Sequence, residues 1–269
     1  MSILDRIVED THERVRQAKE RISPREMVKS ARETEQARDF FAAIRTAVIS
    51  REQAVIAEIK RRSPSAGLIR DDFDPVDIAK RYHKNGAAAL SCLTEPNFFG
   101  GDLGFIQSIR KAVPLPVLRK DFLIDPYQVY EARTAGADAI LLIAECLSEE
   151  LLAEMLGIAE SLSMTTLLEI HDEKNLDIAL DVFVEHRPLR ALLGINNRDL
   201  STMTTDIRHT LDLLSRVADR SIVVSESGIR SHDDLLMLRE HDVRIVLVGE
   251  SLMKQPDPGT ALAELLTGR

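Results

Sequence analysis

Residues 116–145 read PVLRKDFLIDPYQVYEARTAGADAILLIAE, and this stretch contains one complete unit of the pattern that organises most of the chain. The apolar run 116–121 is followed by charged and apolar residues at helical spacing and then by a second apolar run at 139–145. Both runs are continuous rather than alternating, as in strands of a parallel sheet that is covered on both faces. The stretch therefore predicts a strand, a helix and a second strand.

The same unit recurs from about residue 54 to the end of the chain. The predicted strands lie at 54–60, 89–95, 116–121, 139–145, 165–170, 192–197, 222–228 and 245–251. Eight strands that alternate with helices in a chain of 269 residues indicate an α/β fold, a (β/α)8 TIM barrel. A doubly wound open sheet is the alternative that this pattern leaves.

The first fifty residues lack this alternation. Apolar residues at 3, 4, 7, 8 and 15 predict one amphipathic helix, and the sequence from residue 23 continues with helical character. We expect residues 1–50 to form an N-terminal helical extension that packs as a lid on the barrel. No linker rich in glycine and serine marks a second boundary, so residues 1–269 are predicted to form one barrel domain.

Composition argues against several classes of protein. The net charge is −9, which provides no positive field for nucleic acid. Two cysteines, Cys92 and Cys146, and seven histidines without metal-binding spacings predict no metal site and a reducing, cytoplasmic location. The N-terminus lacks the apolar core of a secretion signal and no apolar run has the length of a membrane helix, so we expect no membrane partner.

Charged or amide side chains end nearly all the predicted strands, where barrel enzymes carry their active sites. Glu58 and Lys60 are two residues apart and share one face of the first strand. Burying unpaired charges inside a barrel is costly, which favours a chemical role for this pair. The other candidates of this kind are Lys120, Glu169, Asn196, Asn197 and Glu226.

Other residues that follow the strands have simpler interpretations. Glu95, Asp121, Glu145 and Asp172 are expected to cap the helices that follow them. Lys60 and Lys120 do not fit that role, because the helix dipole opposes a cation at a helix start. Ser227-Gly228 and Gly249-Glu250-Ser251 follow the last two strands, where barrels often bind phosphate, although simple turns explain them equally well.

Seven segments together resemble indole-3-glycerol-phosphate synthase of tryptophan biosynthesis. They are IAEIKRRSPSAG (56–67), LTEPNFFGGD (93–102), VLRKDFLIDPYQVYEARTAGADAILLI (117–143), LLEIHDE (167–173), GINNRDL (194–200), SESGI (225–229) and VGESLM (248–253). They follow the family's order, and the N-terminal helices resemble the family's extension over the mouth of the active site. The resemblance implies a carbon-carbon lyase that needs no cofactor or metal. Its reaction converts 1-(2-carboxyphenylamino)-1-deoxyribulose 5-phosphate into indole-3-glycerol phosphate, carbon dioxide and water.

The resemblance assigns five residues to the reaction itself. Lys120 of LRKDF matches the general acid that protonates the substrate ketone during ring closure, and Glu58 is the carboxylate expected to pair with it. Lys60 matches a second lysine, which meets the anionic groups of the substrate and takes part in proton transfer. Glu169 matches the general base of the final dehydration, and Asn196 matches the amide that positions the substrate. Glu169 serves only if it stays ionised.

Further residues match substrate contacts in the same family. Arg198 resembles the cation that receives the anthranilate carboxylate, a task that suits the planar guanidinium. Ser63 matches a contact on the loop after the first strand. Phe99 matches an aromatic beside the anthranilate ring, and an ordinary core phenylalanine is the alternative. The remaining matches are Glu226, which lines the site, and the phosphate cradle of Ser227, Gly228, Gly249 and Glu250.

Two other functions are alternatives. A phosphoribosylanthranilate isomerase on the same architecture needs a cysteine and an aspartate at strand ends, whereas Cys92 lies before the end of its strand. A non-catalytic barrel scaffold would have lost charged residues that are all present here. One departure from the family is an excess of about six residues within 181–193, expected at the barrel face away from the site. We expect a monomer that acts on a small-molecule substrate.

Overall fold

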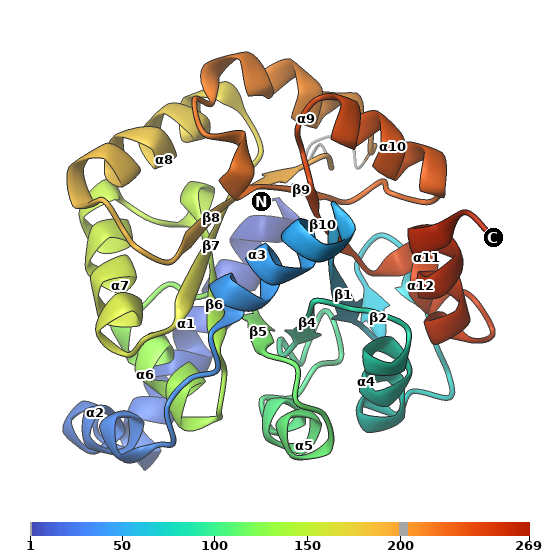
Figure 1. Cartoon of the computed structure of the whole chain (residues 1–269). Helices are drawn as coiled ribbons and strands as arrows, with labels where there is room; N and C mark the ends of the chain where they lie inside the picture. The colour runs from blue at the N-terminus through green and yellow to red at the C-terminus, as the bar shows by residue number, and fades with distance from the viewer. Residues whose placement is uncertain (1, 199–203) are drawn as a thin grey trace.

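The computed structural model describes residues 2–198 and 204–269, and within them the predicted strands form a closed barrel (Figure 1). The parallel strands follow one another around it in the order β1 (Ala54–Ile59), β10 (Ile245–Val248), β9 (Val223–Glu226), β8 (Ala191–Asn196), β7 (Thr165–Ile170), β6 (Ala139–Ile143), β5 (Val117–Lys120) and β4 (Ala89–Leu93). β1 pairs with both β10 and β4, so the sheet has no free edge. The prediction of a TIM barrel is confirmed, and the open-sheet alternative is wrong.

Helices surround the barrel on its outer side. They are α4 (Pro75–Lys84), α5 (Gly104–Ala112), α6 (Pro126–Thr134), α7 (Glu149–Ser161), α8 (Glu173–His186), α9 (Arg208–Leu213), α10 (His232–Glu240) and α12 (Pro258–Thr267). The short elements are β2 (Arg62–Ser63), β3 (Gly67–Leu68), η1 (Ala144–Cys146), η2 (Leu214–Arg216), η3 (Arg220–Ile222) and α11 (Glu250–Met253). Asp74, Asp125 and Asp257 each cap a helix that begins with proline, a combination that defines the helix start. In the described ranges, no helix is long and apolar enough to cross a membrane.

Side chains inside the barrel lie in layers that alternate strands contribute, as is usual for this architecture. One buried apolar layer comes from β1, β5, β7 and β9 and consists of Ile56, Leu118, Leu167 and Val224. Two residues further along the same four strands stand Glu58, Lys120, Glu169 and Glu226. Because side chains alternate between the faces of a strand, these charged residues form the next layer, towards the carboxyl ends. We call these four residues the charged layer.

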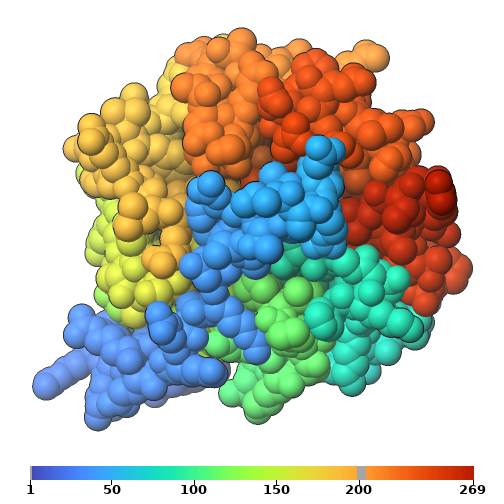
Figure 2. Space-filling model, viewed as in Figure 1, coloured from blue at the N-terminus to red at the C-terminus, as the bar shows by residue number. Residues whose placement is uncertain are grey.

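The N-terminal extension contains α1 (Ile3–Arg21), α2 (Pro24–Glu33) and α3 (Phe40–Arg51), which lie at different places on the barrel. α3 crosses the amino-terminal end of the barrel, in front in Figure 1, and Figure 2 shows it over the centre of that face. Its residues Phe40 and Ile44 are fully buried against the first residues of the strands. α1 lies behind the barrel in this view, at the carboxyl ends of the strands. The expected lid is therefore formed by α1, whereas α3 closes the opposite end.

The region with the unexpected extra residues, 181–193, contains the last turns of α8, a short connection and the start of β8. α8 ends at His186, and Arg187 after it adopts a left-handed conformation with φ of 45°. The connection joins the amino-terminal end of β8, on the side of the barrel that α3 covers. Its expected position away from the carboxyl ends of the strands is confirmed.

Ile44→Ala is expected to lower the free energy of unfolding by about 2 to 5 kcal/mol, because it leaves a cavity between α3 and the barrel. Ile49→Ala on the same helix is a matched control. Ile49 is 79% exposed, so its truncation should change the free energy by less than about 0.5 kcal/mol. Urea unfolding measures both variants, and equal losses of stability would contradict the role of α3 in closing the barrel.

Candidate active site

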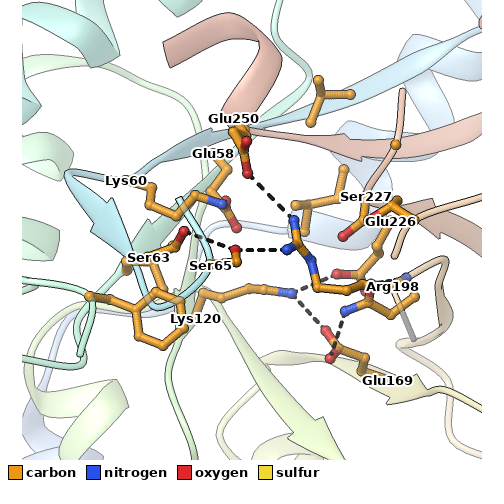
Figure 3. A pocket seen from close by; sticks show the side chains of 18 of the residues that line it. Glu58, Lys60, Ser63, Ser65, Lys120, Glu169, Arg198, Glu226, Ser227 and Glu250 are labelled. Atoms are coloured by element: carbon orange, nitrogen blue, oxygen red, sulfur yellow. Dashed lines mark hydrogen bonds and ion pairs between the residues drawn. The ribbon is translucent and has the colours of Figure 1, made fainter. Parts of the chain in front are cut away.

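A cavity of about 600 Å³ opens at the carboxyl ends of the barrel strands (Figure 3). The residues that the family resemblance assigned to the site all line it: Glu58, Lys60, Ser63, Phe99, Lys120, Glu169, Asn196, Arg198, Glu226, Ser227, Gly228, Gly249 and Glu250. Asn197, the other strand-end candidate, does not line it: the residue is buried, and its Nδ2 donates to Oγ of Ser225 at 2.9 Å and to the carbonyl oxygen of Ser227 at 3.0 Å. The fold thus brings together residues that lie far apart in the chain, such as Glu58 and Glu250, which are separated by 192 positions. Among the residues that the structure describes, no group of three or more His, Cys, Asp or Glu side chains is arranged to hold a metal ion.

Lys120, the last residue of β5, is held between two carboxylates. Its Nζ lies 2.7 Å from Oε2 of Glu169 and 2.6 Å from Oε2 of Glu226 (Figure 3). The Lys120 side chain is 14% exposed, and those of the two glutamates are 5% and 2% exposed. The ion pairs therefore lie where water screens charge poorly, and the two carboxylates stabilise the ammonium against the cost of its burial.

Glu58 does not form the expected ion pair with Lys120. Its Oε1 lies 2.6 Å from Nζ of Lys60 instead. The physical reason is competition, because Lys60 follows two residues later on the same face of the strand, whereas Glu169 and Glu226 already hold the ammonium of Lys120. Glu58 still adds its negative charge to the field around Lys120.

The charges of this layer shift one another's pKa values. Burial alone would lower the pKa of Lys120, but the negative charges of Glu169 and Glu226 raise it above its usual range. Burial would raise the pKa of Glu169, and the positive charges of Lys120 and His171 hold it below its usual value. Burial and the charge of Glu169 raise the pKa of Glu226 more than Lys120 lowers it. The layer thus combines a protonated amine with an ionised carboxylate.

Two glycines on neighbouring strands leave room for the buried carboxylates. A β-carbon at Gly194 in β8 would lie 2.3 Å from Oε1 of Glu226, and one at Gly249 after β10 would lie 2.3 Å from Oε1 of Glu58. Atoms that are not bonded cannot approach so closely. The two glutamates can therefore occupy these positions only beside residues without a side chain.

Asn196 and Arg198 extend the site from the end of β8. Asn196 donates from Nδ2 to Oε1 of Glu169 at 3.2 Å, so both oxygens of Glu169 have partners. Arg198 donates from Nη1 to Oγ of Ser65 at 2.7 Å, and its Nη2 lies 3.4 Å from Oε2 of Glu250. The guanidinium reaches across the cavity mouth in Figure 3, where it can receive an anionic group.

The loop after β1 and the loop after β4 contribute a polar and an apolar wall. Oγ of Ser63 accepts a hydrogen bond from the N–H of Ala66 at 3.1 Å and lies 3.3 Å from Oγ of Ser65. Phe99 lines the cavity and packs against Phe122, with 6.1 Å between ring centroids. A flat apolar surface therefore stands beside the charged groups.

The turn after β9 has an unusual main-chain conformation. Ser227 adopts φ of 67° and Gly228 adopts φ of 84°. The left-handed conformation is unfavourable for a serine, and such strain gathers at binding sites, where the surrounding structure imposes it. On the neighbouring strand end, the carboxylate of Glu250 lies 2.7 Å from Nζ of Lys254.

α1 lies over the mouth of the cavity. Its lining residues are Ile3, Leu4 and Ile7. Polar contacts attach the helix to loops that follow the strands. Asp10 accepts a hydrogen bond from Nδ2 of Asn97 at 2.8 Å, and Nζ of Lys19 lies 2.6 Å from Oδ2 of Asp125. The lid is thus apolar towards the cavity and held by ion pairs and hydrogen bonds at its rim.

The four carboxylates that were expected to cap helices all accept hydrogen bonds from main-chain N–H groups. Asp172 accepts from Asn175 at 2.8 Å and caps α8 as predicted. Glu95 accepts from the N–H groups of residues 97–99, and Asp121 accepts from the N–H of Phe122. Glu145 accepts from the N–H of residue 171. The capping prediction is therefore wrong for the last three. The chain after Glu95 and after Asp121 curls back on the carboxylate before the next helix begins, whereas Glu145 accepts from a residue that follows β7.

Comparison with known proteins places the chain in a family. The family model described as indole-3-glycerol phosphate synthase matches residues 4–265. A relative of that name from Rhodopirellula baltica is 45% identical over 266 residues, which is 99% of each chain. Another of that name, from an Acidovorax species, is 46% identical over 267 residues, which is 98% of each chain. This chain belongs to the indole-3-glycerol phosphate synthase family.

Solved structures of much lower identity share the fold of this indole-3-glycerol phosphate synthase family member. The crystal structure of KGPDC from Streptococcus mutans has a TM-score of 0.59 at 12% identity and covers 79% of this chain and 95% of that chain. A 3-hexulose-6-phosphate synthase from Salmonella typhimurium has a TM-score of 0.63 at 11% identity and covers 80% and 97%. At these identities the likeness shows the fold alone.

Sequence reasoning missed some contributions to the cavity of this indole-3-glycerol phosphate synthase family member. Ser65 accepts a hydrogen bond from Arg198, and the feature of the sequence that could have indicated it is its position in the same loop as Ser63. His171 also lines the cavity, and its signal was its position two residues after Glu169 on the same strand face. The apolar residues of α1 predicted a helix with one packed face, but not that Ile3, Leu4 and Ile7 on this face would line the cavity.

Gly194→Ala is expected to lower the free energy of unfolding by about 1 to 3 kcal/mol, because the added methyl group overlaps the carboxylate of Glu226. Gly157→Ala in α7 is the matched control. Nothing lies within 4 Å of a β-carbon at Gly157, so that change should raise the free energy by about 0.5 to 1 kcal/mol. Denaturant unfolding measures both, and a Gly194→Ala protein as stable as the unchanged chain would refute the close approach.

Proposed function

We propose that this protein converts 1-(2-carboxyphenylamino)-1-deoxyribulose 5-phosphate into indole-3-glycerol phosphate, with release of carbon dioxide and water. The observation that supports this most directly is the ammonium of Lys120 between Glu169 and Glu226 in the wall of the cavity. Relatives that carry the corresponding name match nearly the whole chain. The reaction needs an acid, a base and sites for two anionic groups, and this cavity offers a candidate for each.

Lys120 is proposed as the acid of ring closure. The aromatic carbon attacks the ketone carbon, and the ketone oxygen takes a proton from the ammonium and becomes a hydroxyl group. The neighbouring carboxylates hold the proton on Lys120 until an oxygen of higher basicity develops beside it. Lys60, paired with Glu58, supplies the second ammonium, which meets the anionic groups of the substrate and takes part in proton transfer.

Glu169 is proposed as the base of the final step. After carbon dioxide leaves, the hydroxyl group takes a proton from the ammonium of Lys60 and departs as water, while a base removes one proton from the ring intermediate. The lowered pKa of Glu169 keeps it ionised at neutral pH, and Asn196 and Lys120 hold its two oxygens. The carboxylate is thereby charged and oriented before the substrate arrives, which reduces the reorganisation that proton transfer requires.

The anionic groups of the substrate have separate candidate sites. Arg198 is proposed to bind the anthranilate carboxylate through its two terminal nitrogens, with Phe99 beside the ring and Ser63 in contact on the loop. The phosphate is proposed to bind the main-chain N–H groups of Ser227, Gly228, Gly249 and Glu250. Arg230 and Lys254 also line the cavity and add positive charge.

The alternative of an isomerase with a catalytic cysteine lacks support from Cys92. That residue is fully buried in the apolar core and does not line the cavity. Burial raises its pKa, so its thiol resists ionisation. The scaffold alternative lacks support as well, because the whole charged layer is present and paired.

We also propose that a single chain is the working unit and that it acts in the cytoplasm. Every residue assigned above comes from one chain and lines one cavity. Both Cys92 and Cys146 are free thiols, in keeping with a reducing compartment.

The direct test is to incubate the purified protein with the carboxyphenylamino deoxyribulose phosphate and no added cofactor. Indole fluorescence should rise as product forms. A protein that is folded and produces no fluorescent product under these conditions would overturn the proposed function.

Lys120→Met should lower kcat by a factor of about 10² or more, because methionine has a similar length but cannot donate a proton. Substrate binding should change less. Lys174→Met, at an exposed position in α8, is the control and should keep the rate of the unchanged protein. Steady-state kinetics of both variants test the assignment, and near-normal turnover of Lys120→Met would refute it.

A further inference from the structure

A second group of charged side chains lies against Glu169 and has no part in the mechanism above. His171 follows Glu169 by two residues at the end of β7, and Glu145 lies in η1 after β6. Nδ1 of His171 is 3.3 Å from Oε2 of Glu145, and Nε2 of the same ring is 3.5 Å from Oε1 of Glu169. The imidazole therefore stands between two carboxylates.

Glu145 holds His171 at two points. Its Oε1 accepts a hydrogen bond from the main-chain N–H of His171 at 2.8 Å, while its Oε2 faces the ring. His209 in α9 contacts the carbonyl oxygen of His171 through its ring at 2.9 Å. The side chain of His171 is only 8% exposed, so the ring has little freedom to turn away from Glu169.

The surroundings favour the charged form of this ring. Burial would lower the pKa of His171, but the contact with Glu145 and the negative charges of Glu169 and Glu226 outweigh burial and raise it. The other titratable groups in this neighbourhood are Lys120 from β5, Cys146 from η1 and His209 from α9. Lys120 is the amine among them, protonated before the reaction begins, and it contacts the other oxygen of Glu169.

Lys120 cannot keep Glu169 ionised through the whole reaction. Once Lys120 has given its proton to the ketone oxygen, it is neutral, and Glu169 has lost its nearest positive charge before it must act as a base. His171 contacts Oε1 of Glu169 rather than Oε2 and donates no proton to the substrate in that step. A positively charged His171 at this place favours the ionised form of Glu169 whether Lys120 is protonated or neutral.

We propose that His171, oriented by Glu145, is a positioning residue that keeps Glu169 charged and aligned for the dehydration step. This inference rests on the proposed role of Glu169. Asn196 donates a hydrogen bond to Oε1 of Glu169, Nε2 of His171 lies 3.5 Å from the same oxygen, and Lys120 donates to Oε2. The carboxylate held in this way lines the cavity.

His171→Asn tests the inference, because asparagine is polar but uncharged. With the positive charge removed, the pKa of Glu169 rises, and its ionised form is lost at a higher pH than in the unchanged enzyme. The acid limb of the kcat against pH profile should move up by about one unit. At neutral pH Glu169 stays ionised in the variant as well, so a fall in kcat there, expected to be about tenfold, reports the lost alignment of the carboxylate, with KM changed less than about twofold.

Glu145→Gln is the second variant. It keeps an oxygen for the N–H of His171 but removes the charge that favours the imidazolium, so it should shift the acid limb in the same direction by a smaller amount. In the double variant with His171→Asn this additional shift should vanish, because Glu145 acts through the ring. Should His171→Asn fail to fold, Glu145→Gln alone still supplies the pH profile.

His209→Asn is the control for a purely structural effect. It removes the contact with the carbonyl oxygen of His171 but leaves the ring in place, so the acid limb should stay where it is. An unmoved acid limb in both His171→Asn and Glu145→Gln, or an equal shift in His209→Asn, would overturn the inference. Absence of turnover in the unchanged protein would instead count against the proposed function, so the two failures are distinguishable.

Discussion

Lys120 carries a positive charge inside the barrel because two carboxylate oxygens lie within 2.7 Å of its Nζ. The three residues come from β5, β7 and β9, which are alternate strands, and alternate strands contribute side chains to the same layer of a closed barrel. Closure of the sheet is therefore what lets these charges meet. Conversely, an unpaired ammonium or carboxylate at this depth would cost several kcal/mol, so the pairing is what lets the barrel tolerate charge there.

The charged layer also explains features that carry no charge themselves. Gly194 and Gly249 stand on the strands between those of the layer and leave space for Glu226 and Glu58. Directly beneath the layer the same strands supply Ile56, Leu118, Leu167 and Val224, which are apolar and buried. The charged side chains are consequently shielded from water by the apolar layer below them, while from above they are accessible to a substrate in the cavity.

The strands could be predicted because each must be apolar on both faces, which produces continuous runs with polar ends. The same two-residue period showed that Glu58 and Lys60 share a face. It could not show which side chains of different strands meet, and the expected pair of Glu58 with Lys120 was wrong for that reason. The partner of His171 was hidden in the same way, because Glu145 comes from the loop after the neighbouring strand. The position of α3 was equally hidden, since Phe40 and Ile44 are buried by strand residues that follow much later in the chain.

The placement of α1 and α3 at opposite ends of the barrel has a consequence for how substrates enter and products leave. α3 fills the amino-terminal end with Phe40 and Ile44, so the described part of the fold leads reactants and products past α1. A bulky sugar phosphate and a small gas molecule would then share one doorway, bordered by Ile3, Leu4 and Ile7. Substrate binding and product release would then use the same opening, so indole-3-glycerol phosphate would have to dissociate before the next substrate molecule binds.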